Sequence, residues 1–409
     1  MKTAFIIAEY NPFHNGHRYH IEQTRKSGVE AIIVLLSGNF VQRGDIAVAD
    51  RFLRAECAVR CGADLVLELP VKYAVANASK FARGGVLSAN ACGLEGVLSF
   101  GASADPALLH QAVSFLRMPE VMERASLLSK EKGKSYPAAL EQLLREMKRD
   151  ELADLLGDPN NILGLEYIKA MQGCERLSPL IIERSQERGH DSVNIDAGFA
   201  GASFIRSLID AEKSVDILQG EVIQSLIPAE AKSILSRAAS TASFPVDRQK
   251  YELMLYARIL SKNAADFRQI DNVSQGLENK LTEALRSSST VTEALMAVKS
   301  KRYTLARLRQ IVVAAALGIT REDTDGAPSF LRVLAFNDTG RKVLARMRET
   351  AEVPVVTNLS DVSRLASCAR DAELDYLEGK LFDLCLPTPI GGNPSFFRHP
   401  VCIRNAEKD

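Results

Sequence analysis

Short apolar runs alternate with longer amphipathic segments over the first half of the chain, a pattern typical of α/β proteins. The apolar runs predict strands over residues 3–8, 31–36, 64–67 and 96–100. The segments between them each stop near a glycine, as helices often do, and predict helices over residues 17–27, 50–61 and 79–92. Because these strands lack polar alternation, we predict a Rossmann-like α/β fold whose parallel sheet is covered on both faces.

The loops that follow the predicted strands should meet at one edge of this sheet. Right-handed crossovers place the carboxyl ends of parallel strands together, and α/β proteins bind ligands at that edge. The four loops cover residues 9–16, 37–45, 68–73 and 101–105. We therefore expect the functional site among them.

The pattern changes at about residue 216. Strand-like runs disappear beyond it, and helical patterns cover residues 247–264, 275–286, 291–298 and 305–316. This change predicts an α/β domain over residues 1–215 and a mainly α-helical domain over residues 216–409.

The amino-acid composition says more about the cellular compartment of the protein than about its function. The chain has 51 Lys and Arg against 51 Asp and Glu, so RNA binding would need a local basic patch. The first apolar run is too short for a signal peptide, and no run approaches the ~20 apolar residues of a membrane span. The seven cysteines include no Cys-x-x-Cys pair, which favours free thiols in a reducing cytosol. We expect a cytoplasmic protein without membrane contact.

The loop after the first predicted strand ends in His14-Asn15-Gly16-His17. Gly16 lets the backbone approach a phosphate, and the start of the following helix directs N–H groups at that anion. His14 and His17 can donate hydrogen bonds to the charge that develops on an α-phosphate and on departing pyrophosphate. The motif predicts nucleotidyl transfer with both histidines as catalytic residues. A pair of surface histidines that cap a helix is the alternative.

This motif resembles the signature of the HIGH nucleotidyltransferase superfamily. Residues 9–20, 37–44 and 62–70 resemble the bacterial tRNA(Met) cytidine acetate ligases, with further matches at 159–167 and 301–304. The resemblance implies an enzyme that activates acetate with ATP as acetyl-adenylate, releasing pyrophosphate. It then acetylates N4 of the wobble cytidine of elongator tRNA(Met), forming N4-acetylcytidine and AMP. The first domain would activate acetate, and the second would bind tRNA.

The same resemblance implies the ligands and most of the nucleotide contacts. Mg²⁺ would bridge the phosphates of ATP, without a predicted protein ligand, and no protein partner is evident. The residues implied to contact ATP in the first loop are Ile7, Ala8, Glu9, Tyr10, Asn11, Pro12, Phe13, His14, Asn15, Gly16, His17, Arg18, Tyr19 and His20.

Later segments are expected to complete the nucleotide site. Gly101 follows the fourth strand, where a missing side chain either admits adenosine or only forms a turn. Asn160 and Asn161 open a helix, and one of them suits its cap. By the resemblance, one of these asparagines contacts ATP together with Arg184, which ends a further strand over residues 180–184.

Ser203 and Arg206 occupy the place of the superfamily's second phosphate motif, by the same resemblance. Ala202 and Phe204 depart from it, because relatives often carry hydroxyls there. We keep Ser203 and Arg206 as ATP contacts; an ordinary helix start with a solvated arginine is the alternative.

The remaining candidates concern the substrates. Asn39 and Arg43 lie in a loop with two glycines, where Arg43 could pair with acetate or a phosphate, or be solvated. Arg51 and Arg54 share a helix face that points to the phosphates or to solvent. Residues 297–309 carry five basic residues and no acidic one. The tRNA contacts predicted in this run are Lys301, Arg302, Tyr303 and Arg307.

Tyr303 is the expected stacking platform for an unpaired base, and a second basic run over residues 341–348 could extend the patch. A solvated helix face is the alternative for both runs. Two other functions stay open: a small-molecule adenylyltransferase of the same superfamily, and a non-catalytic RNA-binding relative. The helical half argues against the first, and the intact histidine motif argues against the second.

Overall fold

The computed structural model describes residues 1–133, 135–183, 193–194, 199–211, 218–273, 276–362, 364–389 and 394–404. Among the predicted site residues, Arg184 lies outside the described residues.

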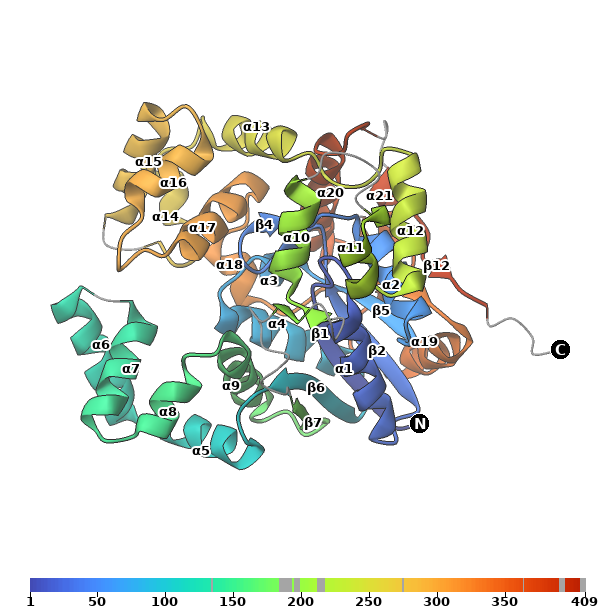
Figure 1. Ribbon diagram of the computed structural model, residues 1–409, viewed down its shortest axis with the longest axis horizontal. Helices are drawn as coiled ribbons and strands as arrows, with labels where there is room; N and C mark the ends of the chain where they lie inside the picture. Colours follow the sequence, from blue (N-terminus) through green and yellow to red (C-terminus); the bar gives the residue numbers. More distant parts are fainter. Residues whose placement is uncertain are drawn as a thin grey trace.

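An eight-stranded sheet forms the centre of the protein, in the order β11-β10-β5-β2-β1-β6-β7 with β12 beside β10 (Figure 1). The strands that run parallel to one another are β1 (Thr3–Ala8), β2 (Ala31–Ser37), β5 (Leu65–Leu69), β6 (Gly96–Ala102) and β7 (Leu177–Glu183). They include every strand expected from the apolar runs. The predicted parallel sheet is therefore confirmed.

Helices cover both faces of the sheet. Successive residues of each strand point to opposite faces, so a strand of apolar residues has side chains to bury on both. Phe5 and Ile33 belong to one hydrophobic core, and Ile6 and Val34 to the other. The helices over the first core are α4 (Ala78–Ala91), α9 (Pro159–Met171) and α19 (Asp338–Thr350). The helices over the second core are α1 (Asn15–Lys26), α2 (Arg51–Arg60), α10 (Ala202–Ala211), α11 (Glu221–Leu226) and α12 (Ala229–Ser240).

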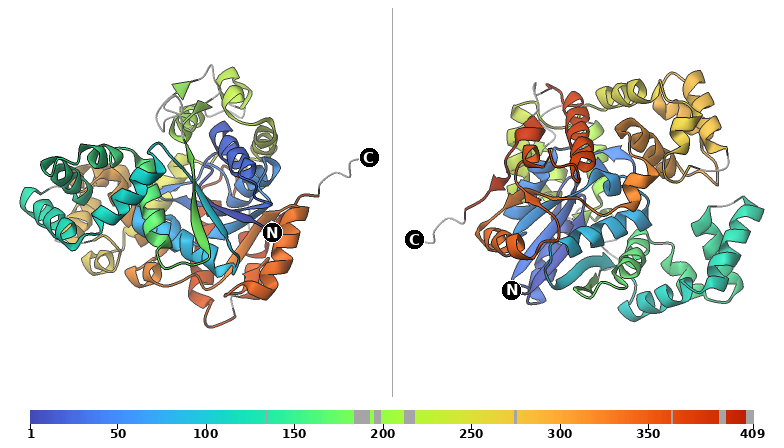
Figure 2. Two further views of the ribbon diagram at one scale, coloured as in Figure 1. Left: turned by 90° about the horizontal axis from the view of Figure 1, so that it is seen from below. Right: turned by 180° about the vertical axis from the view of Figure 1, so that it is seen from behind.

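Two groups of helices extend from the sheet on the same side of the molecule (Figures 1 and 2). The group between β6 and α9 comprises α5 (Pro106–Leu116), α6 (Pro119–Lys132), α7 (Tyr136–Glu146) and α8 (Asp150–Leu155). It is absent from the predicted elements. The second group, a helical unit with its own core, comprises α13 (Arg248–Ile259), α14 (Ala264–Arg268), α15 (Leu277–Ser287), α16 (Val291–Val298), α17 (Leu305–Leu317) and α18 (Arg321–Asp325).

Strands do not end at residue 216, so this part of the prediction is wrong. β10 (Leu331–Phe336) lies antiparallel beside β5, and β11 (Val355–Val356) and β12 (Val401–Cys402) pair with β10. A short run like β10 becomes a strand through a partner far away in the chain, which local patterning does not reveal. In addition, α12 shares a core with α2, so elements on both sides of residue 216 pack together.

The remaining elements complete the fold. They are β3 (Phe40–Val41), β4 (Asp45–Ile46), α3 (Val71–Ala74), β8 (Val193–Asn194), β9 (Phe199–Ala200), a 3-10 turn (Leu359–Asp361), α20 (Ala369–Leu384) and α21 (Pro394–Phe397). Within the described ranges, no helix has both the length and the apolar character needed to cross a membrane.

Candidate active site

The loops after β1 and β2 meet at the carboxyl edge of the sheet, as predicted. Glu9 Oε1 accepts a hydrogen bond from Gln42 N at 2.9 Å, and Asn11 Oδ1 accepts one from Val48 N at 2.8 Å. Arg54 is buried beneath them and donates from Nη1 to Glu9 O at 2.5 Å. Arg54 therefore holds loop backbone, and the prediction that it points to phosphates or to solvent is wrong.

The two signature histidines cap the N-terminus of α1. His14 Nδ1 accepts a hydrogen bond from Gly16 N at 3.1 Å, and His17 Nδ1 accepts one from His14 N at 3.2 Å. Their rings are stacked, with centroids 3.6 Å apart. Because each Nδ1 accepts a backbone N–H, each neutral ring carries its proton on Nε2. Capping and donation to a phosphate are thus compatible, since they use different nitrogens.

The surroundings of the pair fix the positions of its rings. A Cβ on Gly16 would lie 2.9 Å from His14 Cε1, so a larger residue would displace that ring. The Tyr10 and Phe13 rings pack against His17, with centroids 4.7 and 5.6 Å away. Tyr10 has a φ of 47°, a conformation that costs a non-glycine residue about 1 kcal/mol or more. Burial of its ring offsets that cost.

The rest of the predicted ATP stretch has mixed surroundings. Asn15 Nδ2 donates to a carbonyl of α11 at 2.8 Å, and His20 Nε2 lies 2.9 Å from Ser99 Oγ. Arg18 forms ion pairs of 3.1 and 3.3 Å with acidic residues of α1 and α12. The buried members are Tyr10, Asn11, Pro12, Phe13 and His14, and the half-buried members are Ile7, Ala8, Glu9, Asn15, Gly16, His17, Arg18, Tyr19 and His20.

The asparagines at the start of α9 do not cap that helix, contrary to the prediction. Asp158 is the cap, and its Oδ1 accepts from Asn160 N at 2.8 Å and from Asn160 Nδ2 at 3.1 Å. Asn161 is buried and accepts from Ser103 N at 3.0 Å, which fixes the turn after β6. Gly101 is half-buried and lies inside β6, before that turn. The cap falls on Asp158 because Pro159 takes the first helical position, which places both asparagines inside the first turn.

The segment predicted as the second phosphate motif is hydrogen-bonded to the signature loop. Arg206 Nη1 donates to Asn11 O at 2.8 Å, and its Nη2 donates to Ser203 Oγ at 3.1 Å. Burial lowers the pKa of Arg206, while Glu9 and Asp45 oppose that shift. The side chain is therefore not a solvated arginine at an ordinary helix start. It joins two segments that the sequence separates widely.

The loop after β2 contains the two predicted substrate contacts at different depths. Asn39 is 1% exposed, and its Oδ1 accepts from Arg51 N at 2.8 Å. Its Nδ2 is buried without a hydrogen-bond acceptor among the described residues. Arg43 is exposed at the tip of the same loop. A buried amide without an acceptor is costly, and a bound carboxylate would supply that acceptor.

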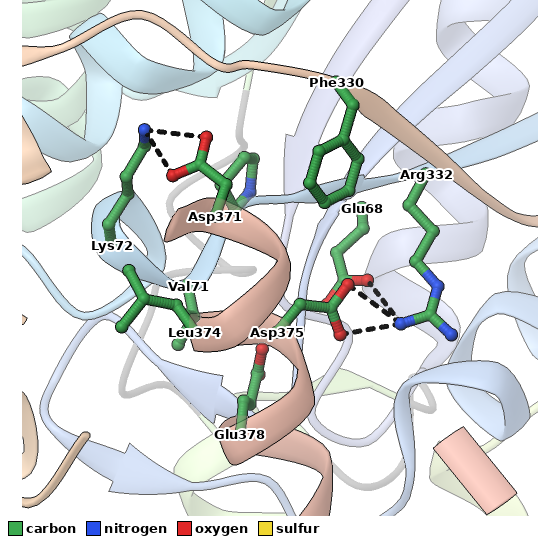
Figure 3. Close-up of a pocket in the computed structure, with 10 residues that line it drawn as sticks. Glu68, Val71, Lys72, Phe330, Arg332, Asp371, Leu374, Asp375 and Glu378 are labelled. Atoms are coloured by element: carbon green, nitrogen blue, oxygen red, sulfur yellow. Dashed lines mark hydrogen bonds and ion pairs between the residues drawn. The ribbon is translucent and has the colours of Figure 1, made fainter. Parts of the chain in front are cut away.

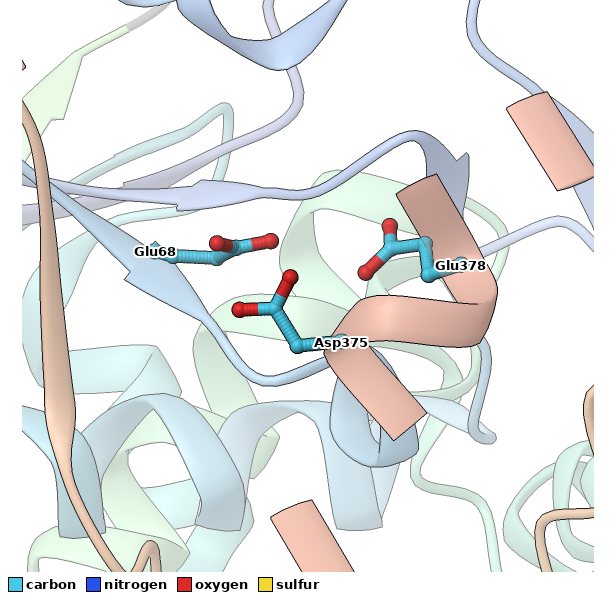
Figure 4. Close-up of side chains that lie close together, drawn as sticks. All are labelled: Glu68, Asp375 and Glu378. Atoms are coloured by element: carbon cyan, nitrogen blue, oxygen red, sulfur yellow. The ribbon is translucent and has the colours of Figure 1, made fainter. Parts of the chain in front are cut away.

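Glu378, on α20, binds the backbone of this loop, and the sequence analysis did not predict it. It accepts hydrogen bonds from Asn39 N and, at 3.3 Å, from Phe40 N. The close-up in Figure 4 shows Glu378 with its two acidic neighbours, Glu68 and Asp375. A signal was available in Glu68, a charged residue inside the otherwise apolar strand β5.

Two arginines compensate these three carboxylates in the interior. Arg51 contacts Asp375 at 2.6 Å, Glu378 at 3.3 Å and also Glu68. Arg332 pairs with Asp375 at 2.6 Å, which Figure 3 shows beside the Glu68 carboxylate. Arg51 is fully buried, so the prediction that it points to phosphates or to solvent is wrong. We call these five residues the charge cluster.

The charge cluster does not fit a divalent cation. Glu68, Asp375 and Glu378 lie close enough together to hold one, but guanidinium groups already face them. Burial raises the pKa of Glu68 and of Glu378. Burial also disfavours ionised Asp375, but Arg332 and Arg51 outweigh it and lower the Asp375 pKa. Two positive charges thus face three carboxyls, and we infer that one carboxyl retains its proton.

The predicted tRNA segment is confirmed as a basic surface only in part. Lys301 is exposed and Arg302 is half-buried, but Tyr303 is only 4% exposed. Its ring lies 5.3–5.9 Å from the cationic groups of Lys280, Arg302 and Arg307. Tyr303 is therefore not an open stacking platform, and that prediction is wrong. The ring packs inside the helical unit because burial of its apolar face is favourable.

Arg307 is also tied to the protein. Its Nε and Nη2 donate to Asn272 O at 3.2 and 2.5 Å, and burial lowers its pKa. Of the three basic residues among the predicted tRNA contacts, Lys301 and Arg302 are thus the two whose side chains make no hydrogen bond to a carbonyl of the described residues.

Comparison with known proteins agrees with this geometry. The HIGH Nucleotidyl Transferase family matches residues 1–390. The tRNA(Met) cytidine acetate ligase of Acetivibrio thermocellus is 32% identical over 404 residues, which cover 95% of this chain and 96% of that protein. The tRNA(Met) cytidine acetate ligase of Caldanaerobacter subterraneus subsp. tengcongensis is 32% identical over 412 residues, with 98% and 99% covered.

The fold is similar to that of Thermotoga maritima TmcAL bound with alpha-thio ATP, with a TM-score of 0.88 and 29% identity. The match covers 99% of this chain and 100% of that one. This similarity confirms the predicted α/β nucleotidyltransferase fold with additional helices. The chain belongs to the tRNA(Met) cytidine acetate ligases, a family of enzymes within the HIGH nucleotidyl transferases.

Proposed function

We propose that this protein activates acetate with ATP as acetyl-adenylate and then acetylates N4 of the wobble cytidine of elongator tRNA(Met). The observation that carries the proposal is the histidine pair, whose Nδ1 atoms are used by the helix cap. Both Nε2–H groups are thereby oriented for an anion at the start of α1. The relatives of known name act on tRNA(Met) cytidine, and we place the reaction in the cytoplasm.

In the first step, an acetate oxygen attacks the α-phosphorus of ATP, and the bond to pyrophosphate breaks. His14 and His17 stabilise the negative charge that develops, and one such donor is worth about 2.7–4 kcal/mol. Arg206 is close enough to the signature loop to bind the leaving phosphates. Asn39 Nδ2 and Arg43 are the proposed partners of the acetate carboxylate, since one is a buried donor and the other a nearby cation.

In the second step, the cytidine N4 attacks the acetyl carbon of the adenylate. The carbon–oxygen bond to AMP breaks, and the amine loses a proton. No protein nucleophile is required, because the mixed anhydride is already an activated acyl group. We assign tRNA binding to the helical unit and to Lys301 and Arg302. Residues 1–215 would supply most of the activation site, with the strands and helices beyond them as its support.

Mg²⁺ is proposed only as a companion of the ATP phosphates. Among the described residues, the three carboxyls of the charge cluster lie close enough together to hold a metal ion. The arginines that already pair with them exclude metal binding. No step of the proposed mechanism depends on a metal ligand from the protein.

ATP–pyrophosphate exchange tests the first step directly. The purified protein should exchange labelled pyrophosphate into ATP with acetate present, and much less with formate or without acid. Labelled acetate should then appear in a tRNA(Met) transcript and disappear when its wobble cytidine is replaced by uridine. Exchange that ignores acetate would contradict the proposal. Labelling of a small acceptor without tRNA would favour the small-molecule adenylyltransferase instead.

A further inference from the structure

A large cavity lies between the sheet domain and the helical unit, outside the residues assigned above. Its volume is about 700 Å³, within the range of roughly 300–1,000 Å³ that small-ligand sites occupy. Its walls come from the β3–β4 turn, α10, α13, α16 and α17, which Figure 1 shows around one place in the fold. A carboxylate as small as acetate would leave most of this volume unfilled.

One end of the cavity adjoins the proposed reaction site. Arg248 lines it and pairs with Asp45 at 2.8 Å and with Asp210 at 3.2 Å. Asp210 also lines the cavity and follows Arg206 by one turn of α10, and Arg206 Nη1 donates to Asn11 O in the signature loop. A ligand in the cavity would therefore lie beside the signature loop and the Arg43 loop.

The β3–β4 turn is also fixed against the helical unit. Gly44 has a φ of 69°, and a Cβ there would lie 2.3 Å from Gln310 N on α17. Gln310 Nε2 donates to Gln42 O at 2.5 Å. The loop with the predicted acetate contacts and α17, which carries the end of the basic run, thus lie side by side in the wall of the cavity.

The chemistry of the walls suits a nucleotide with an exocyclic amine. Leu253 lines the cavity and is 69% exposed, so it offers an apolar surface for a base. Asp45, Asp210 and Glu252 supply carboxylate oxygens, the acceptors that recognise the N4 amine of cytosine.

Arg309 supplies a cation for a backbone phosphate. It lines the cavity, is exposed, and has no hydrogen bond or ion pair with any described residue. Arg248, in contrast, is neutralised by its two carboxylates. Arg309 also ends the basic run that begins at Lys299, so an RNA strand on that run would reach the cavity.

We infer that this cavity receives a cytidine nucleotide turned out of an RNA strand and presents its amino group to the signature loop. The inference rests on the proposed function and deepens it, because it assigns the acceptor site. Unpaired bases of RNA are commonly recognised in this way, by contacts to the base edge and stacking on the base face.

Filling the cavity tests the inference. Gln249 is exposed on the first turn of α13 and lines the cavity, so Gln249→Trp should occupy it without disturbing the core. Gln111→Trp, on the exposed face of α5, is the matched control. Arg309→Ala removes the proposed phosphate contact, with Arg286→Ala on α15 as its control.

The probe is an anticodon stem–loop RNA with pyrrolocytidine at the wobble position, whose fluorescence rises when the base leaves its stack. Wild type and both controls should raise the fluorescence. Gln249→Trp should abolish the rise and lower tRNA acetylation at least about 10-fold, an effect of 1.4 kcal/mol. Arg309→Ala should weaken RNA binding several-fold. Acetate-dependent ATP–pyrophosphate exchange should stay within twofold of wild type in all four variants.

Wild-type acetylation and fluorescence in Gln249→Trp would overturn the cavity assignment. Equal loss of exchange and acetylation would overturn it too, because the substitution would then act on activation. Failure of the proposed function looks different: the wild-type protein would show no acetate-dependent exchange, whatever the fluorescence of the RNA. Thermal unfolding of each variant shows whether it is folded.

Discussion

The histidine pair and the charge cluster serve the same edge of the sheet, but they are built in opposite ways. His14 and His17 are neighbours on one helix start, so a single cap fixes both rings. The charge cluster joins β5, α2, α20 and β10, and exists only when these distant segments are packed. The proposed catalytic residues are therefore positioned by neighbours in the sequence, whereas the residues that fix the surrounding loops are positioned by the whole fold.

If that contrast holds, the charge cluster should govern stability. We expect Asp375→Asn to lower the free energy of unfolding by about 3–5 kcal/mol, because two buried guanidinium groups lose their shared carboxylate. Glu68→Gln should cost much less, since burial raises the Glu68 pKa and favours its neutral form already. Urea unfolding of both variants measures the difference. Equal losses would mean that Glu68 is not the carboxyl that retains the proton.

The histidine pair should show the reverse behaviour. We expect His17→Ala to lower acetate-dependent ATP–pyrophosphate exchange by ~10²-fold or more, the effect of losing one transition-state donor. The variant should stay folded, with a loss of only about 1 kcal/mol in the free energy of unfolding from the removed cap contact. His110→Ala, at an exposed site on α5, should change neither quantity. A folded His17→Ala protein with near wild-type exchange would remove His17 from the mechanism.

Lys301 and Arg302, on the surface of the helical unit, should contribute neither to stability nor to acetate activation, unlike the charge cluster and the histidine pair. We expect Lys301→Ala combined with Arg302→Ala to weaken tRNA binding and to flatten its log–log salt dependence by about 1.5. Exchange should be unaffected. Binding titrations over a salt series measure this, with Lys26→Ala and Arg60→Ala as the control pair. An unchanged slope would mean that Lys301 and Arg302, in the connection between α16 and α17, are solvated and do not contact tRNA.

The smallest expected effect is a pH dependence of stability. The raised pKa of Glu68 means that the folded state favours its protonated form. The stabilisation from this group is fully present below the ordinary value of 4.5 and is lost as the pH rises through the raised pKa. The free energy of unfolding should thus decline over this range more steeply in wild type than in Glu68→Gln. Parallel pH profiles of the two proteins would contradict it.

Much of the α/β fold follows from the sequence for a simple reason. Apolar runs such as those of β1 and β2 must be buried on both faces, and a parallel sheet between helices is the arrangement that achieves this. The family was also within reach, because the signature residues are contiguous. β10 was not, because a short segment with one arginine among its apolar residues does not reveal that it pairs with β5.

The candidate site divides in the same way. The sequence by itself determined the histidine motif, the helix start beneath it and the loops that follow the strands, because each depends on neighbours in the chain. Only the tertiary structure decided that Tyr303 is buried, that Arg51 and Arg54 hold loops, and that Glu378 supports Asn39. Burial and charge pairing between distant segments depend on how those segments pack in the folded protein, and local sequence patterns do not predict that packing.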